Sequence, residues 1–130
     1  AAQPGIYGIQ AAIAAVHAPA RSAQETNWRQ IVSLYDALVA AYPSPVVELN
    51  RAVAVAMTDG PEAGLETIAA IRNLNDLNSY HLLHAARADL LRRLNRNSDA
   101  RSAYETALRL ARQEPERRFL RKRLESISGT

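Results

Sequence analysis

Two histidines three residues apart, His81 and His84, have a spacing that could hold a metal ion in this 130-residue sequence. Residues three apart lie on the same face of a helix, so both imidazoles could reach one ion. Zinc would need a third ligand there, but the sequence has no cysteine and Asp89 lies too far round the helix. We therefore expect no metal and no cofactor, and we expect the histidines to line a packed or concave surface.

Catalytic motifs are absent from the sequence. It has no phosphate-binding loop, no dinucleotide fingerprint and no nucleophile elbow, and its five glycines are dispersed. Glu62 and Glu66 are four residues apart, a spacing that more often coats a helix than supplies an acid and a base. We expect a protein that is not an enzyme.

Polar residues on two predicted helices are better candidates for recognition. In arrays of helical hairpins the first helix of each hairpin lines a concave groove, where Asn and Arg can hold a carboxylate or an extended backbone. A second interpretation stays open, in which Arg51 and Arg87 pair internally with Asp36, Glu48 or Asp89 and tie the helices together. The groove candidates are Asn50, Arg51, His81, His84, Arg87 and Asp89.

Positive charge is concentrated in the C-terminal third. The formal net charge is +3, made up of −3 for residues 1–86 and +6 for residues 87–130. Such a face can meet an acidic protein surface or a phosphate backbone, although a solvated helix face explains it as well. Because Phe119, the one aromatic residue nearby, is expected to be buried by the last helix, we do not expect contact with DNA. The predicted basic surface comprises Arg117, Arg118, Arg121 and Lys122.

Helices must position these side chains. The 25 alanines favour helix and close helix packing, and no alternating pattern of a sheet is present. Asn27 or Thr26 can cap one helix, Ser44-Pro45 can open the next, and Gly60-Pro61 can both end a helix and begin another. The expected helices are 6–18, 28–42, 45–59, 61–73, 80–94, 98–113 and 115–127, with a polar loop at 75–78.

Apolar residues form one stripe on several of these helices. The second helix has Trp28, Ile31, Tyr35 and Leu38, and the third has Val46, Leu49, Val53 and Met57. The last has Leu120, Leu124 and Ile127. The apolar stretch at 6–18 is too short to span a bilayer and no basic residue precedes it, so we expect neither a membrane segment nor a signal peptide.

The sequence aligns with itself at a separation of 36 residues. Small residues at such positions let two helices approach closely, and an aromatic residue fills the gap to the next hairpin. Trp28, Ile31 and Tyr35 also follow the opening pattern of a tetratricopeptide repeat, with Val32 where glycine is usual. The matched pairs are Arg51 with Arg87, Ala52 with Ala88, Val55 with Leu91, Gly64 with Ala100, Ile68 with Tyr104 and Ile71 with Ala107.

These patterns predict an all-α fold. We expect a right-handed array of antiparallel hairpins of the tetratricopeptide type, with about seven helices in a single domain over 1–130. The hairpins are expected near 6–42, 45–73 and 80–113, and a capping helix at 115–127 closes the last one. An ordinary helical bundle is the alternative.

Longer strings resemble one family. Extracytoplasmic-function sigma factors of bacterial RNA polymerase that carry a tetratricopeptide-like C-terminal extension have similar segments in the same order. Two departures are Asn95, where glycine is usual after Leu94, and Asn27, where Asp is common. The strings are GIQAAIAAVHA (8–18), WRQIVSLYDAL (28–38), PSPVV (43–47), LNRAVAVA (49–56), DGPEAGL (59–65), YHLLHAARADLLRRL (80–94) and ERRFL (116–120).

The resemblance implies a cytoplasmic, non-catalytic regulatory domain that contributes to control of transcription initiation. Its partners would be proteins: the sigma domains upstream, the polymerase or a regulator. Because the chain lacks an initiator Met, we expect it to be a piece of a longer protein with promoter-reading domains before it. The alternative is a free-standing adaptor that binds a peptide or small ligand in its groove. The oligomeric state is left open.

Overall fold

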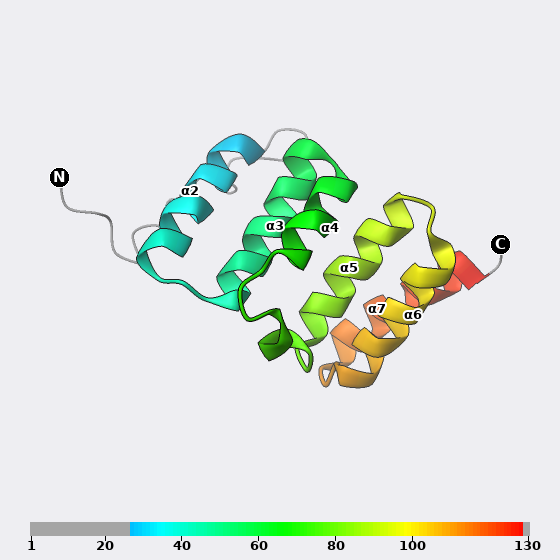
Figure 1. Cartoon of the computed structure of the whole chain (residues 1–130). Coiled ribbons are helices and arrows are strands. Elements are labelled where there is room, and N and C mark those ends of the chain that lie inside the picture. The colour runs from blue at the N-terminus through cyan, green and yellow to red at the C-terminus, as the bar shows by residue number, and fades with distance from the viewer. Residues whose placement is uncertain (1–26, 129–130) are drawn as a thin grey trace. The chain divides into compact units, whose positions relative to one another are not determined.

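The computed structural model describes residues 27–128, and all the regular secondary structure in this range is helical. It contains no strand, which confirms the all-α class, and Figure 1 shows the helices in chain order. The expected helix at 6–18 lies outside the described residues, whereas the other six are present. They are α2 (Trp28–Ala41), α3 (Pro45–Asp59), α4 (Pro61–Ala69), α5 (His81–Arg93), α6 (Asn97–Leu110) and α7 (Glu114–Ser128), and a 3-10 turn, η1 (Leu74–Leu77), precedes α5.

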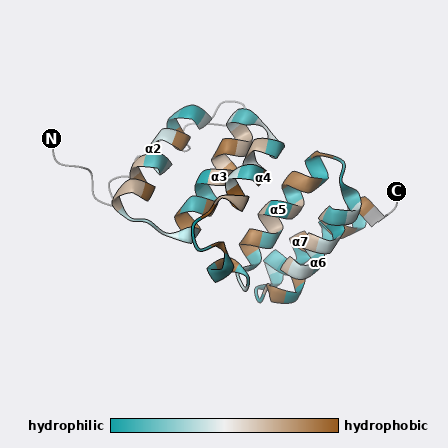
Figure 2. Ribbon diagram, viewed as in Figure 1, coloured by the Kyte–Doolittle hydropathy of each residue, from teal (hydrophilic) through white to brown (hydrophobic). Residues whose placement is uncertain are grey.

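The chain divides into two compact units, Ala1–Arg72 and Asn73–Thr130. In the first unit α3 packs against both α2 and α4, and in the second α6 packs against both α5 and α7. Hydrophilic and hydrophobic residues are interspersed along these helices (Figure 2). None of the helices among residues 27–128 is both long enough and apolar enough to cross a membrane. The single domain expected over 1–130 stays a prediction.

The helix starts in the first unit follow the predicted signals. The side-chain oxygen of Asn27 accepts a hydrogen bond from the backbone N–H of Gln30 at 3.1 Å, which satisfies a donor at the start of α2. Ser44 occupies the cap position of α3 without a side-chain cap bond, and Pro45 is the first residue of that helix. Gly60, at φ +101°, ends α3 and directly precedes α4.

The apolar face predicted for α3 is partly wrong. Val46 and Val53 are 38% and 39% exposed, although Leu49 from the same stripe is buried. The other buried residues of α3 are Ala52, Ala54, Val55 and Ala56. Because α3 lies against two helices, it buries more than one stripe, and alanines allow the close approach on both sides.

The end of α4 also differs from the prediction. The helix ends at Ala69, not near Asn73, and Asn73 adopts a left-handed conformation with φ +59°. Asparagine tolerates this conformation better than most residues, so the chain can turn directly into η1. The expected polar loop at 75–78 is therefore largely a 3-10 turn, anchored by Leu77, which is 3% exposed.

A tight turn joins α5 to α6 in the second unit. Asn95 has φ +61°, and the N–H of Arg96 donates to the carbonyl of Leu91 at 2.9 Å. This is the hydrogen bond of a Schellman motif, in which a left-handed residue follows the helix. Asparagine therefore takes the place that glycine usually holds there, without losing the turn.

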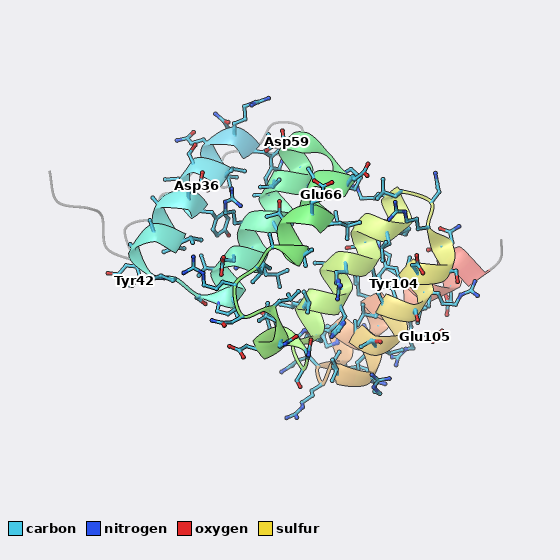
Figure 3. The ribbon with its side chains drawn as sticks, in the orientation of Figure 1. Asp36, Tyr42, Asp59, Glu66, Tyr104 and Glu105 are labelled. Atoms are coloured by element: carbon cyan, nitrogen blue, oxygen red, sulfur yellow. The ribbon has the colours of Figure 1, made fainter. Side chains whose placement is uncertain are left out.

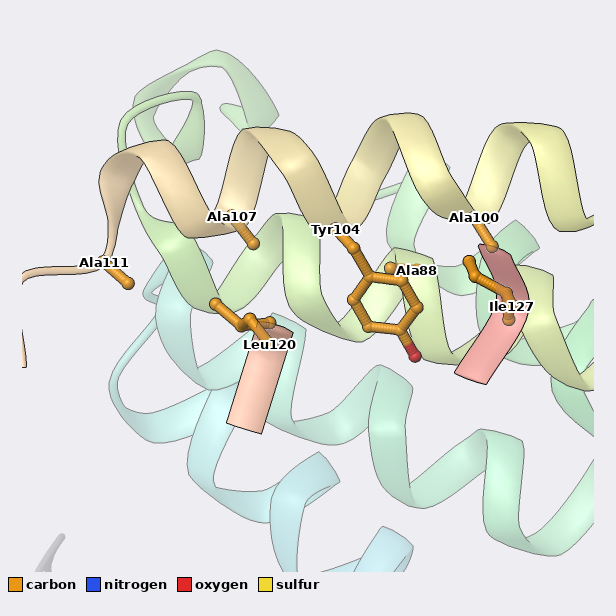
Figure 4. Close-up of a cluster of buried hydrophobic side chains, with 7 residues drawn as sticks. All are labelled: Ala88, Ala100, Tyr104, Ala107, Ala111, Leu120 and Ile127. Carbon is orange, nitrogen blue, oxygen red and sulfur yellow. The ribbon is translucent and has the colours of Figure 1, made fainter. Parts of the chain in front are cut away.

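The core of the second unit is built around one aromatic side chain. Tyr104 projects from α6 beside Ala88 of α5, with Leu120 and Ile127 of α7 on either side (Figure 4). Leu124 is partly buried against the same cluster, so the stripe predicted for the last helix is confirmed. The buried members of the cluster are Ala88, Ala100, Tyr104, Ala107, Ala111, Leu120 and Ile127.

Burial follows the 36-residue alignment. Ala52 and Ala88 are both fully buried, and Ile68 at 1% and Tyr104 at 0% exposure are equivalent to each other. A further matched pair, Gly64 and Ala100, is also buried. The hairpins α3–α4 and α5–α6 thus use the same positions for contact between their two helices.

Candidate functional site

A pocket of about 260 Å³, called the α3–α4 pocket below, lies among α2, α3 and α4. Its central contact is an ion pair in which Arg51 Nε donates to Asp36 Oδ1 at 2.5 Å. Asp36 belongs to α2, as Figure 3 shows, so the pair ties α2 to α3. The pocket is lined by Asp36, Val39, Glu48, Arg51, Thr67, Ala70 and Ile71.

A second pocket, of about 280 Å³, lies between α5 and α6. His84 Nε2 donates to the backbone carbonyl of Asn78 at 2.8 Å. No hydrogen bond or ion pair joins the guanidinium of Arg87 to any residue in the range 27–128. The pocket is lined by His84, Arg87, Leu91, Asp99, Ser102, Ala103 and Thr106.

The two pockets occupy equivalent places in the 36-residue alignment. Four residues that line the first pocket have an equivalent that lines the second pocket. Only the arginine is the same residue type in both pockets. The pairs are Glu48 with His84, Arg51 with Arg87, Thr67 with Ala103 and Ala70 with Thr106. Each hairpin therefore presents an arginine in the pocket between its two helices.

The two histidines singled out by their spacing have separate contacts. Nε2 of His81 contacts the carboxylate of Glu116, which links α5 to α7, whereas His84 bonds to Asn78. Within residues 27–128 no three His, Cys, Asp or Glu side chains gather as a metal site would require. His81 instead lines a third pocket, of about 490 Å³, with Ser79, Leu110, Arg112, Gln113 and Glu116.

Asp89 lines neither the α3–α4 pocket nor the α5–α6 pocket. Its carboxylate accepts the hydrogen of the Tyr104 hydroxyl, and Arg92 and Arg123 lie 3.9 and 3.7 Å from it. Arg92 Nε in turn donates to the Tyr104 oxygen at 3.2 Å. Burial, followed by the hydrogen bond to Asp89, raises the pKa of Tyr104 to about 12, because both disfavour the phenolate. Asp89 thus joins α5 to α6 and α7.

Asn50 is exposed on α3 and lines neither of these pockets. Of the six groove candidates, His84 and Arg87 share the α5–α6 pocket, and Arg51 lies in the α3–α4 pocket. His81 and Asp89 contact α7 instead.

The four residues of the predicted basic surface on α7 differ in their exposure and contacts. Arg118 and Lys122 are exposed, and Arg121 pairs with Glu114 at 2.5 Å. Arg117 is a correction, because it reaches back and donates to the carbonyls of Leu108 and Ala111 at 2.6 and 3.0 Å. Those carbonyls lie at the C-terminal end of α6, where a cation is favourable.

Phe119 is also a correction. It was expected to be buried by the last helix, but it is 47% exposed. The guanidinium of Arg123 lies 4.9 Å from the centre of its ring, a cation–π distance. Leu120 and Ile127 fill the core, so the neighbouring position on α7 faces outward.

Sequence reasoning missed the opposite wall of the α5–α6 pocket. Asp99, Ser102 and Thr106 come from α6 and contribute most of its polar lining. The 36-residue alignment points only to Thr106, because its equivalent, Ala70, lines the pocket that contains Arg51.

An uncharacterized protein of Rhizobium meliloti (strain 1021) is 43% identical to this chain over 127 residues. The match covers 98% of the chain but only 30% of the relative, so the chain spans about a third of that protein's length. No family model matches the chain. No solved structure matches it either.

Proposed function

We propose that this chain is a non-catalytic, protein-binding extension of a sigma factor of the extracytoplasmic-function type, and that it regulates transcription initiation. The observation that carries a protein-binding role is the equivalence of the two hairpins, which repeat both their buried contacts and an arginine-containing pocket. Repeated hairpins build continuous surfaces for partners rather than a single catalytic centre. The proposal also covers the detailed fold of the chain, a right-handed tetratricopeptide-like array of about seven helices.

The charged and titratable groups support a role without catalysis. Asp36 pairs with Arg51, His81 contacts Glu116, and Tyr104 donates to Asp89. Each contact joins two helices, so these side chains hold elements together. A general acid or base must instead be able to reach a substrate.

The sigma-factor assignment is supported by the seven strings that resemble that family, which lie between residues 8 and 120. The Rhizobium relative is more than three times as long as the matched segment, which leaves room in it for promoter-reading domains. The proposed partners are the sigma domains, the polymerase or a regulator. Because bacterial transcription takes place in the cytoplasm, the proposal entails that location.

Transcription with purified components tests the proposal. The full-length protein that contains this chain, and a version that lacks these 130 residues, are each mixed with core RNA polymerase and a cognate promoter. We expect the deletion to change polymerase binding or promoter output severalfold. The matched control is the full-length protein with Glu105→Gln, an exposed position on α6 outside the predicted basic surface, which should behave as the unaltered protein does.

Two results would contradict the proposal. One is a full-length sequence without a helix-turn-helix region before this segment. The other is equal polymerase binding and equal output with and without the segment. A free-standing adaptor is the second candidate, and it is favoured by Arg87 of the α5–α6 pocket, which has no ion-pair partner among residues 27–128.

A further inference from the structure

We infer that the pocket between α5 and α6 binds a carboxylate of a partner polypeptide through Arg87. The inference goes beyond the proposed function, because it assigns a site and a ligand class. It uses contacts within each of the two units and nothing from the resemblance to sigma factors, so it does not depend on the sigma-factor assignment.

The first hairpin shows what this repeat does with its arginine. Arg51 lies in the pocket between α3 and α4, and its guanidinium holds the carboxylate of Asp36 at 2.5 Å. Asp36 comes from a different helix, α2, which packs against α3. The arginine of this repeat position is therefore used to bind a carboxylate that the hairpin itself does not supply.

Arg87 is the same residue at the equivalent position of the second hairpin, and there no carboxylate of the described residues is bound. It lines the pocket, but none of the Asp and Glu side chains in residues 27–128 is paired with it. The position that holds Glu48 in the first pocket holds His84 in the second, so one negative charge is removed from beside the arginine. A guanidinium offers a carboxylate two parallel charge-assisted hydrogen bonds.

The other polar groups fit a carboxylate carried on a peptide. A carbonyl oxygen can only accept a hydrogen bond, so His84 must donate from Nε2 to the carbonyl of Asn78. In the neutral ring the other nitrogen, Nδ1, then has a lone pair that can accept a hydrogen bond. That lone pair can accept an N–H, a group that a peptide carries and a free inorganic anion lacks. Ser102 adds a hydroxyl donor on the opposite wall.

Asp99 provides a second test of the ligand's charge, because its negative charge would repel a bound carboxylate. It lines the same pocket without pairing with Arg87, and a like charge near a bound carboxylate weakens binding. Neutralising Asp99 should therefore strengthen the binding of an acidic ligand. It should weaken the binding of a cationic one.

The test is an NMR titration of the complete 130-residue chain with two blocked peptides, acetyl-(Gly-Glu)3-amide and acetyl-(Gly-Gln)3-amide. We expect saturable binding of the Glu peptide, with the largest shifts at the Arg87 Nε–H and at the amides of the α5–α6 pocket. The Gln peptide, which has the same length without charge, should not bind. Loss of a charge-assisted pair in Arg87→Gln should weaken binding by about tenfold or more.

Three variants complete the design. Arg51→Gln is the matched control at the equivalent position, and it should bind the Glu peptide as the unaltered chain does. Asp99→Asn should bind it severalfold more tightly. Arg87→Lys retains the charge without the planar fork and should bind with intermediate affinity, which keeps the test decisive if Arg87→Gln loses helix content by circular dichroism.

Several results would overturn the inference. They are equal binding of both peptides, an equal loss of affinity in Arg51→Gln and Arg87→Gln, and weaker binding in Asp99→Asn. Inorganic phosphate that binds at Arg87 as tightly as the peptide would replace the polypeptide ligand with a free anion. The titration contains no polymerase. A negative titration would therefore contradict this inference alone and would leave the result of the transcription experiment unaffected.

Discussion

The hydroxyl of Tyr104 on α6 donates its hydrogen to the carboxylate of Asp89 on α5. The tyrosine ring is fully buried, and Arg92 and Arg123 complete the surroundings of the carboxylate. This contact joins the polar edge of the second unit to its apolar core, and it gives the first prediction.

Tyr104→Phe retains the ring and removes the donor. The Asp89 carboxylate then loses a hydrogen bond in a partly buried place, which should cost about 2 kcal/mol of unfolding free energy. Urea unfolding followed by circular dichroism measures the loss. Tyr42→Phe is the control, because Tyr42 is 44% exposed and its hydroxyl should contribute little. Equal stability of Tyr104→Phe and the unaltered chain would show that the contact is energetically neutral.

The same residue predicts a pH dependence at high pH. The pKa of Tyr104 is raised from 10.0 to about 12 in the folded chain, so the protonated hydroxyl stabilises the fold fully below pH 10. Between pH 10 and 12 the unfolded chain ionises first, and the contribution is lost, amounting to roughly 3 kcal/mol. Over this range the unaltered chain should therefore lose roughly 3 kcal/mol of unfolding free energy relative to Tyr104→Phe, so that its advantage of about 2 kcal/mol at neutral pH disappears. Curves that stay parallel from pH 9 to 12 would contradict the assigned pKa.

Helix positions and the repeat could be predicted from the sequence, because their signals are local. Asn27, Pro45 and Gly60 mark helix ends through their own backbone and side-chain chemistry. The 36-residue alignment also identified buried pairs such as Ile68 and Tyr104.

Contacts between helices were less accessible to sequence reasoning. The exposure of Val53 follows from α3 packing against two helices, which no single-stripe pattern describes. Arg117 and Phe119 both sit beside the core residue Leu120 on α7, yet one caps α6 and the other faces outward. Which of them turns inward depends on the angle at which α7 meets α6, and spacing along one helix does not contain that angle.

At the turn between α5 and α6, two substitutions of the same residue should have different effects on the unfolding free energy. Asn95 has φ +61°, a conformation that glycine adopts freely, that asparagine tolerates and that alanine disfavours. Asn95→Gly should leave the unfolding free energy nearly unchanged or raise it slightly, whereas Asn95→Ala should lower it by about 1 kcal/mol. Thermal unfolding of both variants measures the difference. If the alanine variant is as stable as the glycine variant, the left-handed conformation is not maintained in solution.

Gly60 offers the same test in the first unit. Its φ is +101°, and a Cβ built there would meet no atom within 4 Å. Any cost of Gly60→Ala must therefore come from the backbone, and it should be about 1–3 kcal/mol, because φ +101° with ψ 165° is a region that glycine almost alone occupies. Ala63→Gly is a useful comparison, because that residue is inside α4 and glycine there should cost a similar amount through chain entropy. A loss of several kcal/mol in Gly60→Ala would point to a packing role that the structure does not contain.

Two adjacent arginines on α7 allow the effect of a capping arginine on stability to be compared with that of a surface arginine. Arg117 donates to the carbonyls of Leu108 and Ala111, whereas Arg118 is exposed. Arg117→Ala leaves those two carbonyls without this donor at the end of α6, so we expect a loss of about 1 kcal/mol and faster hydrogen exchange in the last turn of α6. Arg118→Ala changes the net charge equally, and it should alter neither stability nor exchange. If both variants lose the same amount, the effect comes from the overall charge of the basic segment, and the capping contact of Arg117 contributes nothing of its own.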